Sequence, residues 1–375
     1  MTVFHVLPQF HYVNERTIIG GYPSVVGRLA VAQAAQGSRV EIVARMPESV
    51  PPTFSGVALS KLEVLDATSH RHPLRFARKL FVAIRKRVAS GDVIHVHSGH
   101  AEYAVVSAVL ALFLRGRVRH TLYCPVRPGL RGVAQRLAIR SAVACGVAFS
   151  GMSNNICRSM RFRATWTPPV LDSDYFAPGE SDVNDYQLLF VGNATPSKGL
   201  ADLLRAFANL VEKWDQGEKL SLVVTTELKR TSEHSELQEA INDLQGSAAL
   251  SQITWLSIVP DMKDLLASSA IHVAPFRTTN GPSDYFMATL EAMSMGKVCV
   301  VSDLAGMSEV IGDGKNGFAF KAGDSADLER ALSRALECDR AEIGRSAREF
   351  VIETFGTTAV EITNSLYGEV DARIK

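Results

Sequence analysis

Residues 281–309, GPSDYFMATLEAMSMGKVCVVSDLAGMSE, decide the fold of this chain. Turn-forming residues at its start precede an amphipathic run in which Met287, Leu290 and Met293 recur at helical spacing. Residues 297–301, which are apolar after Lys297, then fit a buried parallel strand, and a polar turn follows them. A loop, a helix, a strand and a second loop in this order predict a doubly wound α/β sheet, in which ligands bind at the carboxyl ends of the strands.

The start of the predicted helix offers a place for a diphosphate. The first N–H groups of a helix have no partner within the helix, and the positive end of its dipole lies there. Glu291 lies one turn inside this helix, where its carboxylate could accept two hydrogen bonds from a ribose. We therefore expect a nucleoside diphosphate here, with its diphosphate at the helix start and its ribose on Glu291.

The segment resembles the donor-site signature of retaining glycosyltransferases of family 4, which have the GT-B fold. The family pattern is a Glu, seven residues, a second Glu, and then AMAxGxPVVxTxxGGxxEVI. Glu291 fills the second Glu, and residues 292–311 follow the helix, the strand and the turn in order. The register of the first Glu falls on Ser283, with Asp284 beside it. From the residues alone, the alternative is a generic helix-strand unit of a Rossmann fold.

The resemblance implies an α/β protein of two Rossmann-like domains, with a cleft between them and a C-terminal helix that crosses back. We expect an N-terminal acceptor-binding domain at 1–170, a sugar-nucleotide-binding domain at 171–345, and the returning helix at 346–375. The 375 residues exceed what a single core usually serves. Residues 165–179 are the predicted linker, because their prolines favour extended backbone.

Two loops of the second domain complete the expected donor site. Residues 192–199 resemble the family's GRLxxxKG loop, in which Asn193 stands in place of the Arg and Lys198 is kept. Lys198 is a catalytic candidate, since a leaving diphosphate needs positive partners. Arg277 would supply a second charge, and Val259 lies where the family holds the nucleobase. The expected donor-site residues are Gly192, Asn193, Lys198, Val259, Arg277, Ser283, Asp284, Tyr285, Phe286, Met287 and Glu291.

Motifs in the first domain resemble the acceptor side of the family. Gly20 and Gly21 follow a predicted strand at 3–7, and bare backbone there lets a ligand come close. Residues 92–97 resemble the family's DVVHxH, and residues 118–123 its T-x-H, with Tyr123 in place of the final His. His97 and Tyr123 are therefore catalytic candidates, although from the residues alone the histidine could cap a strand and the glycines form a turn. The expected acceptor-site residues are Gly20, Gly21, Tyr22, His97 and Arg127.

Cysteine usage and hydropathy point to the cytoplasm. The five cysteines include no C-x-x-C pair and are expected to be thiols of a reducing compartment. The amino terminus lacks the basic region and long apolar core of a signal peptide. The most apolar run, 104–114, is too short to span a bilayer.

The net charge of +1 is the sum of two opposite halves. Residues 1–170 hold 22 Lys+Arg and 7 Asp+Glu, and residues 171–375 hold 18 and 32, which restore the 40 and 39 of the whole chain. The densest basic stretch, 70–87, has no acid and mixes apolar with basic residues at helical spacing. A peripheral helix on an anionic membrane, a surface for an anionic acceptor, and a solvated helix on its own sheet all fit this pattern. No nucleic-acid-binding module accompanies it, so we expect no nucleic acid partner.

The resemblance implies a retaining hexosyltransferase acting at the inner face of the cell membrane. Its donor would be a UDP-, GDP- or dTDP-linked sugar, and its acceptor a glycan, lipid-linked or small molecule of bacterial surface polysaccharide or glycoconjugate synthesis. We expect no cofactor and no metal, because the single D-x-D, residues 172–174, fits a turn in the linker. The substitutions at Asn193, Tyr123 and Ser283 leave open a non-catalytic sugar-nucleotide-binding homologue or partner subunit, and an epimerase of the same fold is a further alternative.

Overall fold

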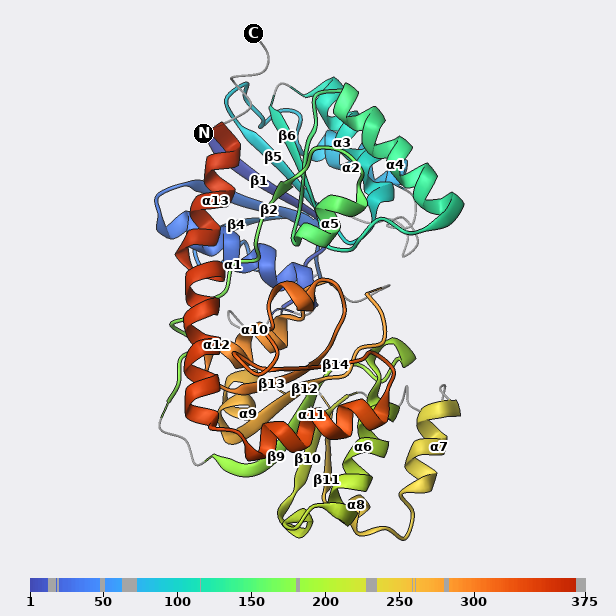
Figure 1. Cartoon of the computed structure of the whole chain (residues 1–375). Coiled ribbons are helices and arrows are strands. Elements are labelled where there is room, and N and C mark those ends of the chain that lie inside the picture. The colour runs from blue at the N-terminus through green and yellow to red at the C-terminus, as the bar shows by residue number, and fades with distance from the viewer. Residues whose placement is uncertain are drawn as a thin grey trace. The chain divides into compact units, whose positions relative to one another are not determined.

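The structure is a computed structural model of the chain (Figure 1). It describes residues 1–12, 18, 20–47, 51–62, 73–114, 116–179, 183–226, 235–257, 259, 261–279 and 283–368. The chain forms two compact units, Met1–Leu171 with Phe355–Lys375, and Asp172–Thr354. Gly281, Pro282 and the first three residues of the basic stretch, 70–72, lie outside the described residues.

A largely parallel sheet lies at the centre of the first unit. Its strand order is β3-β4-β2-β1-β5-β6-β7-β8, and of its described pairings only β3 with β4 is antiparallel. The central strands are buried along most of their length, as expected for a parallel sheet covered on both faces. The strands are β1 (Thr2–Gln9), β2 (Arg39–Arg45), β3 (Thr53–Phe54), β4 (Val57–Lys61), β5 (Val93–Ser98), β6 (Arg117–Leu122), β7 (Ala148–Gly151) and β8 (Thr165–Trp166).

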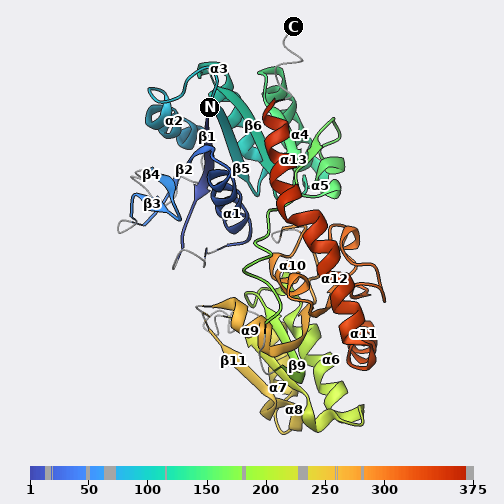
Figure 2. The ribbon, with the colours of Figure 1, turned by 90° about the vertical axis from the view of Figure 1, so that its left-hand side faces the viewer.

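Helices cover both faces of this sheet. On one face lies α3, whose Ser107 Oγ is 2.8 Å from His120 Nδ1 of β6, and α3 contacts both α2 and α4. On the other face, Gln33 of α1 and Tyr367 of α13 hydrogen-bond to histidines of β1 and β5. Helices α1 and α13 lie side by side there (Figure 2). The helices of this unit are α1 (Gly21–Ala35), α2 (Pro73–Ile84), α3 (Ala104–Phe113), α4 (Gly129–Ala144), α5 (Asn154–Ser159) and α13 (Thr357–Gly368), with the 3-10 turn η2 (Ala101–Tyr103).

The second unit has a sheet of parallel strands in the order β11-β10-β9-β12-β13-β14. The chain runs outward in one direction from β9 and then in the other from β12, so the strand order reverses between these two neighbours. In open α/β sheets such a switch point is where ligands bind. The strands are β9 (Asn184–Val191), β10 (Ser221–Thr225), β11 (Ile253–Leu256), β12 (Ser269–Ala274), β13 (Val298–Ser302) and β14 (Phe318–Phe320).

Amphipathic helices cover the second sheet. In α6, Leu200, Leu203, Leu204 and Phe207 are buried at the spacing of one helical face. A Cβ on Gly344 of α12 would lie 2.0 Å from the carbonyl oxygen of Gly296, so the backbone of α12 packs directly on the turn after α10. The helices here are α6 (Leu200–Lys213), α7 (Ser235–Asp243), α8 (Ala248–Ser251), α9 (Met262–Ser268), α10 (Met287–Ser294), α11 (Ser325–Glu337) and α12 (Arg340–Phe355), with the 3-10 turns η3 (Pro196–Lys198), η4 (Gly217–Lys219) and η6 (Met307–Glu309).

The end of the chain returns to the first unit after α12. The N–H of Leu171 donates to the carbonyl oxygen of Phe355 at 2.8 Å. Residue 346, where the sequence predicts the returning segment to begin, lies inside α12, which belongs to the second unit except for its last residue, Phe355. A small core cluster joins α13 to the first unit through Leu29, Val170, Ala359 and Val360. No helix among the described residues combines the length and apolar character needed to span a bilayer.

Candidate functional site

The loop that follows β9 is shaped by its last glycine. Gly199 has φ 65°, and a Cβ there would lie 1.7 Å from the carbonyl oxygen of Pro275. Only glycine fits this backbone conformation at such a distance. The loop after β9 is therefore pressed against the loop after β12, at the switch point of the sheet. Gly192 and Lys198 are half-buried in this loop, and Asn193 is exposed.

Lys198 is held by an aromatic ring. Its Nζ lies 3.6 Å from the centroid of the Phe276 ring, a cation–π contact. Phe276 in turn packs on Phe286, the residue that precedes α10, with ring centroids 4.0 Å apart. Burial lowers the pKa of Lys198 to about 8. The two phenylalanines thus link the lysine of the first loop to the helix start that the sequence assigns to the same site.

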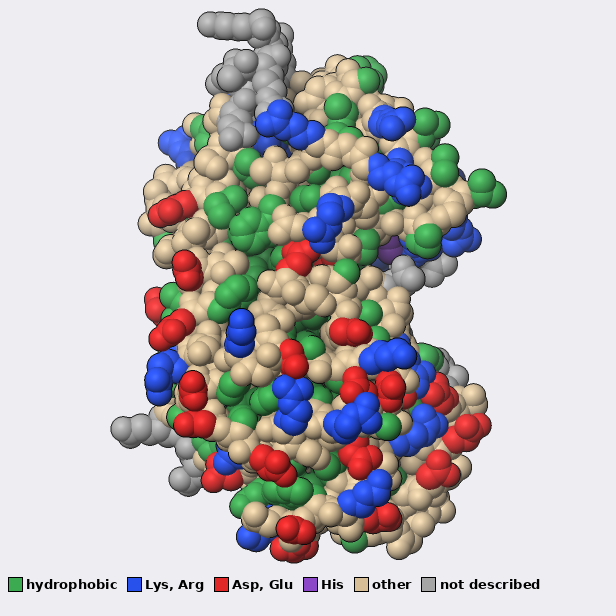
Figure 3. Space-filling model, in the orientation of Figure 1, with side chains coloured by type: hydrophobic (Ala, Val, Ile, Leu, Met, Phe, Trp, Pro, Cys, Tyr) green, Lys and Arg blue, Asp and Glu red, His purple; other side chains and the backbone are tan. Residues whose placement is uncertain are grey.

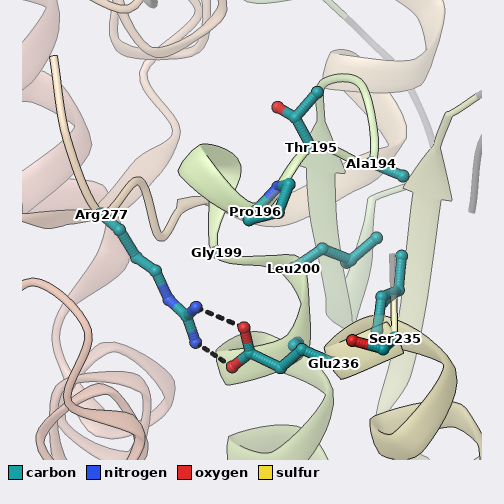
Figure 4. Close-up of a pocket in the computed structure, with 10 residues that line it drawn as sticks. Ala194, Thr195, Pro196, Gly199, Leu200, Ser235, Glu236 and Arg277 are labelled. Atoms are coloured by element: carbon teal, nitrogen blue, oxygen red, sulfur yellow. Dashed lines mark hydrogen bonds and ion pairs between the residues drawn. The ribbon is translucent and has the colours of Figure 1, made fainter. Parts of the chain in front are cut away.

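Arg277 follows Phe276 but is bound by two carboxylates. Its Nε and Nη2 donate to Asp202 at 2.6 and 2.5 Å, and its Nη1 and Nη2 donate to Glu236 at 2.7 and 2.6 Å. Figure 4 shows the pair with Glu236. Two carboxylates therefore already neutralise the guanidinium that the sequence assigns to the diphosphate. It instead ties together the loop after β12, the start of α6 and the start of α7.

A pocket of about 240 Å³ lies beside this ion pair (Figure 4). The side chains of Thr195 and Ser235 line it together with Glu236 and Arg277. The remaining lining residues are Ala194, Pro196, Gly199, Leu200, Ala201 and Leu237. The pocket therefore adjoins the loop that carries Lys198.

The loop before α10 packs tightly on the turn after β13. A Cβ on Gly306 would lie 2.5 Å from the carbonyl oxygen of Asp284, so a side chain there would displace the loop. Tyr285 donates its hydroxyl hydrogen bond to Glu309 at 2.8 Å. Of the donor-site residues expected here, Ser283 is half-buried, whereas Asp284, Tyr285, Phe286, Met287 and Glu291 are buried. The structure thus brings residues 283–287 and 306–309 together at the start of α10.

Val259 precedes residues 283–287 in the sequence and follows a different strand. It is half-buried and follows β11, which is separated from β9 in the sheet by β10. Because parallel strands end at the same edge of their sheet, Val259 lies at the edge that also carries Lys198.

In the first unit, Tyr22 forms the outer layer of the expected acceptor site. Gly20 has φ 102° and precedes α1, whose first turn carries Tyr22. The Tyr22 ring lies 5.2 Å from the Tyr123 ring, and a Cβ on Gly99 would meet both Tyr22 and the Cys124 sulfur within 4 Å. Gly20 and Gly21 are exposed and Tyr22 is half-buried. Exposed backbone beside an aromatic ring is compatible with a bound ligand.

His97 and Tyr123 lie below that layer. They are 0% and 3% exposed, and His97 Nδ1 is 3.0 Å from the Tyr123 hydroxyl. Burial lowers the pKa of His97 well below its usual value and raises the pKa of Tyr123. The sequence assigns both residues to catalysis, but in the structure their polar atoms face each other inside the unit. The backbone N–H of Arg127, the last acceptor-site residue, donates to Gln135 at 2.9 Å, and its side chain is half-buried.

His97 belongs to a cluster of three buried histidines that sequence reasoning missed. His5 Nδ1 lies 2.9 Å from His97 Nε2, and His95 lies between the Tyr367 hydroxyl at 2.8 Å and Thr121 at 2.7 Å. The nitrogens of the three rings are close enough to hold a metal ion. In the structure they hydrogen-bond to each other and to neighbouring side chains, which is the arrangement of a satisfied buried polar network. The sequence did contain a signal for part of this cluster, because His95 and His97 alternate along one strand and so lie on the same face of it.

Residues 185–338 match the family model of the glycosyl transferases group 1. The matched residues all lie in the second unit. It is 27% identical over 320 residues to the alpha-maltose-1-phosphate synthase of Mycolicibacterium smegmatis, which covers 74% of this chain and 79% of that protein. It is 25% identical over 347 residues to the phosphatidyl-myo-inositol mannosyltransferase of the same organism, which covers 88% and 84%. The crystal structure of Anabaena HepE in complex with UDP superposes with a TM-score of 0.72 at 16% identity, over 98% of this chain and 100% of that one. The chain has the GT-B fold that the sequence predicts.

Proposed function

We propose that the protein is a retaining, metal-independent hexosyltransferase that uses a nucleotide-sugar donor. The observation that carries this proposal is the group at the start of α10, where Lys198, its two phenylalanines and the loop 283–287 meet next to Glu291. A half-buried ammonium beside a helix start suits a diphosphate, because both offer positive charge where water is scarce.

The chemistry follows from retention of configuration. The acceptor hydroxyl oxygen attacks the anomeric carbon on the face from which the diphosphate departs. The bond between that carbon and the diphosphate oxygen breaks, and the acceptor proton passes to the departing phosphate. This route uses no general base from the protein, which agrees with the burial of His97 and Tyr123. Lys198 would offset the charge that develops on the diphosphate, and Glu291 would bind the ribose.

Several donors and acceptors fit this proposal. A UDP-linked sugar is supported by the complex of HepE with UDP, and GDP- and dTDP-sugars stay within the proposal. The name of one mycobacterial relative gives a sugar phosphate as its product, and the name of the other gives phosphatidyl-myo-inositol as the molecule to which mannose is transferred. A small-molecule, glycan or lipid-linked acceptor therefore stays within the proposal. We place the reaction in bacterial surface polysaccharide or glycoconjugate synthesis, on the cytoplasmic side of the membrane.

A non-catalytic sugar-nucleotide-binding homologue is the second candidate. It is favoured by one observation in particular: Arg277, which would replace the cation lost at Asn193, is already paired with Asp202 and Glu236. A site with one cation in place of two would still bind a nucleotide but would stabilise its departure less well.

Calorimetric titration with a panel of UDP-, GDP- and dTDP-sugars tests the proposal, followed by assays of slow donor hydrolysis without an acceptor. We expect one nucleotide to bind selectively, and Lys198→Ala and Glu291→Ala to remove both binding and hydrolysis. Lys213→Ala, which changes an exposed lysine of α6, is the matched control and should behave like the wild type. Binding without turnover, even with cell-extract acceptors, would establish the second candidate, and no binding would reject the donor site.

A further inference from the structure

The outward face of the helical layer α2–α3–α4 in the first unit is apolar. Twelve large apolar side chains are exposed among the described residues, and eight of them belong to these three neighbouring helices. They are Leu74, Val82, Leu112, Phe113, Leu130, Val133, Leu137 and Val143. Scattered single apolar residues are ordinary on protein surfaces, but a concentration on one layer indicates an interaction site.

Helix α4 carries the most exposed part of this face. Leu130, Val133 and Leu137 are 89%, 55% and 63% exposed, and their spacing of three and four residues places them on one side of the helix. The core-facing side is formed by other residues, among them the buried Gln135 and Ile139. The exposed stripe is therefore additional to the one that packs α4 on its own unit.

The charges on this layer have one sign. Helix α2 contains Arg75, Arg78 and Lys79, helix α4 contains Arg131, Arg136 and Arg140, and neither helix contains an acid. The nearby Glu102 of η2 accepts a hydrogen bond from Gln135 at 2.9 Å. In Figure 3 the surface over α4 shows hydrophobic and basic side chains and no acidic ones.

A shallow groove joins α2 to α4. It has a volume of about 450 Å³ and is lined mostly by apolar atoms, with Leu74 of α2 and Ala134 and Ala138 of α4 among its walls. Arg131 and Glu102 also line it, so the groove itself holds one charge of each sign. Apolar and cationic groups thus meet within one continuous surface, rather than on separate faces.

We propose that the outward face of α2, α3 and α4 binds the surface of an anionic lipid bilayer. The stripe of α4 and the end of α3 would enter the acyl boundary, and the arginines would meet the lipid phosphates. The six cations of α2 and α4 outnumber the one acid beside them, Glu102, so the face carries a net positive charge that is complementary to such a surface. The apolar side chains stand beside the cations, as in interfacial helices. This inference deepens the proposed function by naming the partner surface. Binding to the bilayer does not depend on the proposed function. Only the further step, that the acceptor is lipid-linked, rests on it.

Sedimentation with vesicles tests the proposal without any nucleotide. The whole protein is mixed with sucrose-loaded vesicles of phosphatidylcholine alone, or with phosphatidylglycerol added to about one third. We expect at least tenfold stronger binding to the anionic vesicles, decreasing as salt is raised, because the arginine contacts are screened. Equal or negligible binding to both would overturn the proposal.

Two double variants separate the apolar and the ionic parts. Leu130→Ser with Leu137→Ser should weaken binding to anionic vesicles by tenfold or more, and Arg131→Gln with Arg140→Gln should abolish the preference for them. The matched control is Leu250→Ser with Ile352→Ser, which removes two exposed apolar side chains from the second unit and should bind like the wild type. If the α4 variants bind like this control, the surface assignment is rejected.

Two readouts keep this result separate from the donor site. Circular dichroism and the nucleotide titration should be unchanged in the α4 variants, since these side chains are exposed and lie in the other unit. Light scattering tests the competing occupant. A wild-type dimer that the leucine variant dissociates, without vesicle binding, would identify the face as an interface between two copies and overturn the bilayer proposal.

Discussion

The ammonium of Lys198 lies 3.6 Å from the centroid of the Phe276 ring. No described carboxylate forms an ion pair with it, so its charge is offset by the π face and not by an anion. An incoming diphosphate can therefore bind Lys198 without first displacing a carboxylate. The cost of this arrangement is desolvation, which lowers the pKa of Lys198 to about 8.

Nucleotide affinity should depend on pH through this lysine. Below pH 8 Lys198 is already charged, and the affinity for a nucleoside diphosphate should be flat. Above pH 8 the free protein loses the proton that the complex requires, so Kd should rise by up to about tenfold per pH unit. Titration calorimetry at pH 8.5, in two buffers of different ionisation enthalpy, should record proton uptake on binding.

The control for this effect is Lys198→Arg. A guanidinium stays charged across this range, so the variant should bind with a pH-independent Kd and without proton uptake. A wild-type Kd that stays constant from pH 7 to pH 9.5 would show that Lys198 does not contact the diphosphate.

The ion pairs of Arg277 should contribute to stability rather than to donor binding. Arg277→Ala leaves Asp202, whose side chain is 4% exposed, with only the longer 3.9 Å contact to Arg205. Breaking a buried ion pair costs about 3–5 kcal/mol, and the partial exposure of Arg277 reduces this to roughly 2–3 kcal/mol. Denaturant unfolding of the second unit would measure the loss.

Arg205→Ala provides the comparison. Arg205 is 36% exposed and pairs with Glu236 at 3.3 Å, so its removal should cost less than about 1 kcal/mol. Because Arg277 is assigned here to stability, both variants should bind the nucleotide within about threefold of the wild-type affinity. A large loss of affinity in Arg277→Ala, with stability unchanged, would return this residue to the diphosphate site.

Gly306 should be required for the shape of the loop before α10. An alanine Cβ would lie 2.5 Å from the Asp284 carbonyl oxygen and 2.7 Å from the Asp284 Cβ, so the loop has to move. We expect Gly306→Ala to weaken nucleotide-sugar binding by about tenfold or more, or about 1.4 kcal/mol. Gly312→Ala is the matched control, because its Cβ would meet nothing closer than 3.6 Å. Equal affinities in the two variants would contradict this role.

The sequence predicts several strands of the two sheets because these depend on local pattern. The predicted strand 3–7 lies inside β1, and the helix predicted from the spacing of Met287, Leu290 and Met293 is α10. Residues 297–301 nearly coincide with β13. Alternation, apolar runs and glycine turns are local signals, and the family resemblance supplied their order.

The interior of the candidate site could not be predicted in the same way. Arg277 meets Asp202 and Glu236 across 75 and 41 residues of sequence, and no local pattern encodes that choice. His95 and His97 alternate with Val96 and so lie on one face of β5, where Tyr367 of α13 covers His95 and where His5 and Tyr123 cover His97. The placement of the helices decides which face of β5 is covered. This placement is a property of the whole unit and not of the local sequence.

Buried histidines should make the protein sensitive to acid. Burial lowers the pKa of His5 and His272 to about 4 and that of His120 to about 3, against about 6.5 in the unfolded chain. Above pH 6.5 the imidazoles are neutral in both states, and their effect is absent. As the pH falls from 6.5 toward 4, the unfolded chain takes up protons that the folded one cannot, so stability is lost, by about 2 kcal/mol per histidine at pH 5. Denaturant unfolding at pH 7.5, 6 and 5 would measure this loss.

His272 allows the effect to be assigned to one side chain in the second unit. Its Nε2 lies 3.1 Å from the Thr289 hydroxyl. His272→Leu removes the titrating ring, and the loss of stability between pH 7.5 and pH 5 should shrink by about 2 kcal/mol. Thr289→Val removes the hydroxyl and keeps the ring, so it should lower stability at both pH values and leave their difference unchanged. If His272→Leu keeps the full wild-type pH dependence, then His272 is not the group whose protonation destabilises this unit.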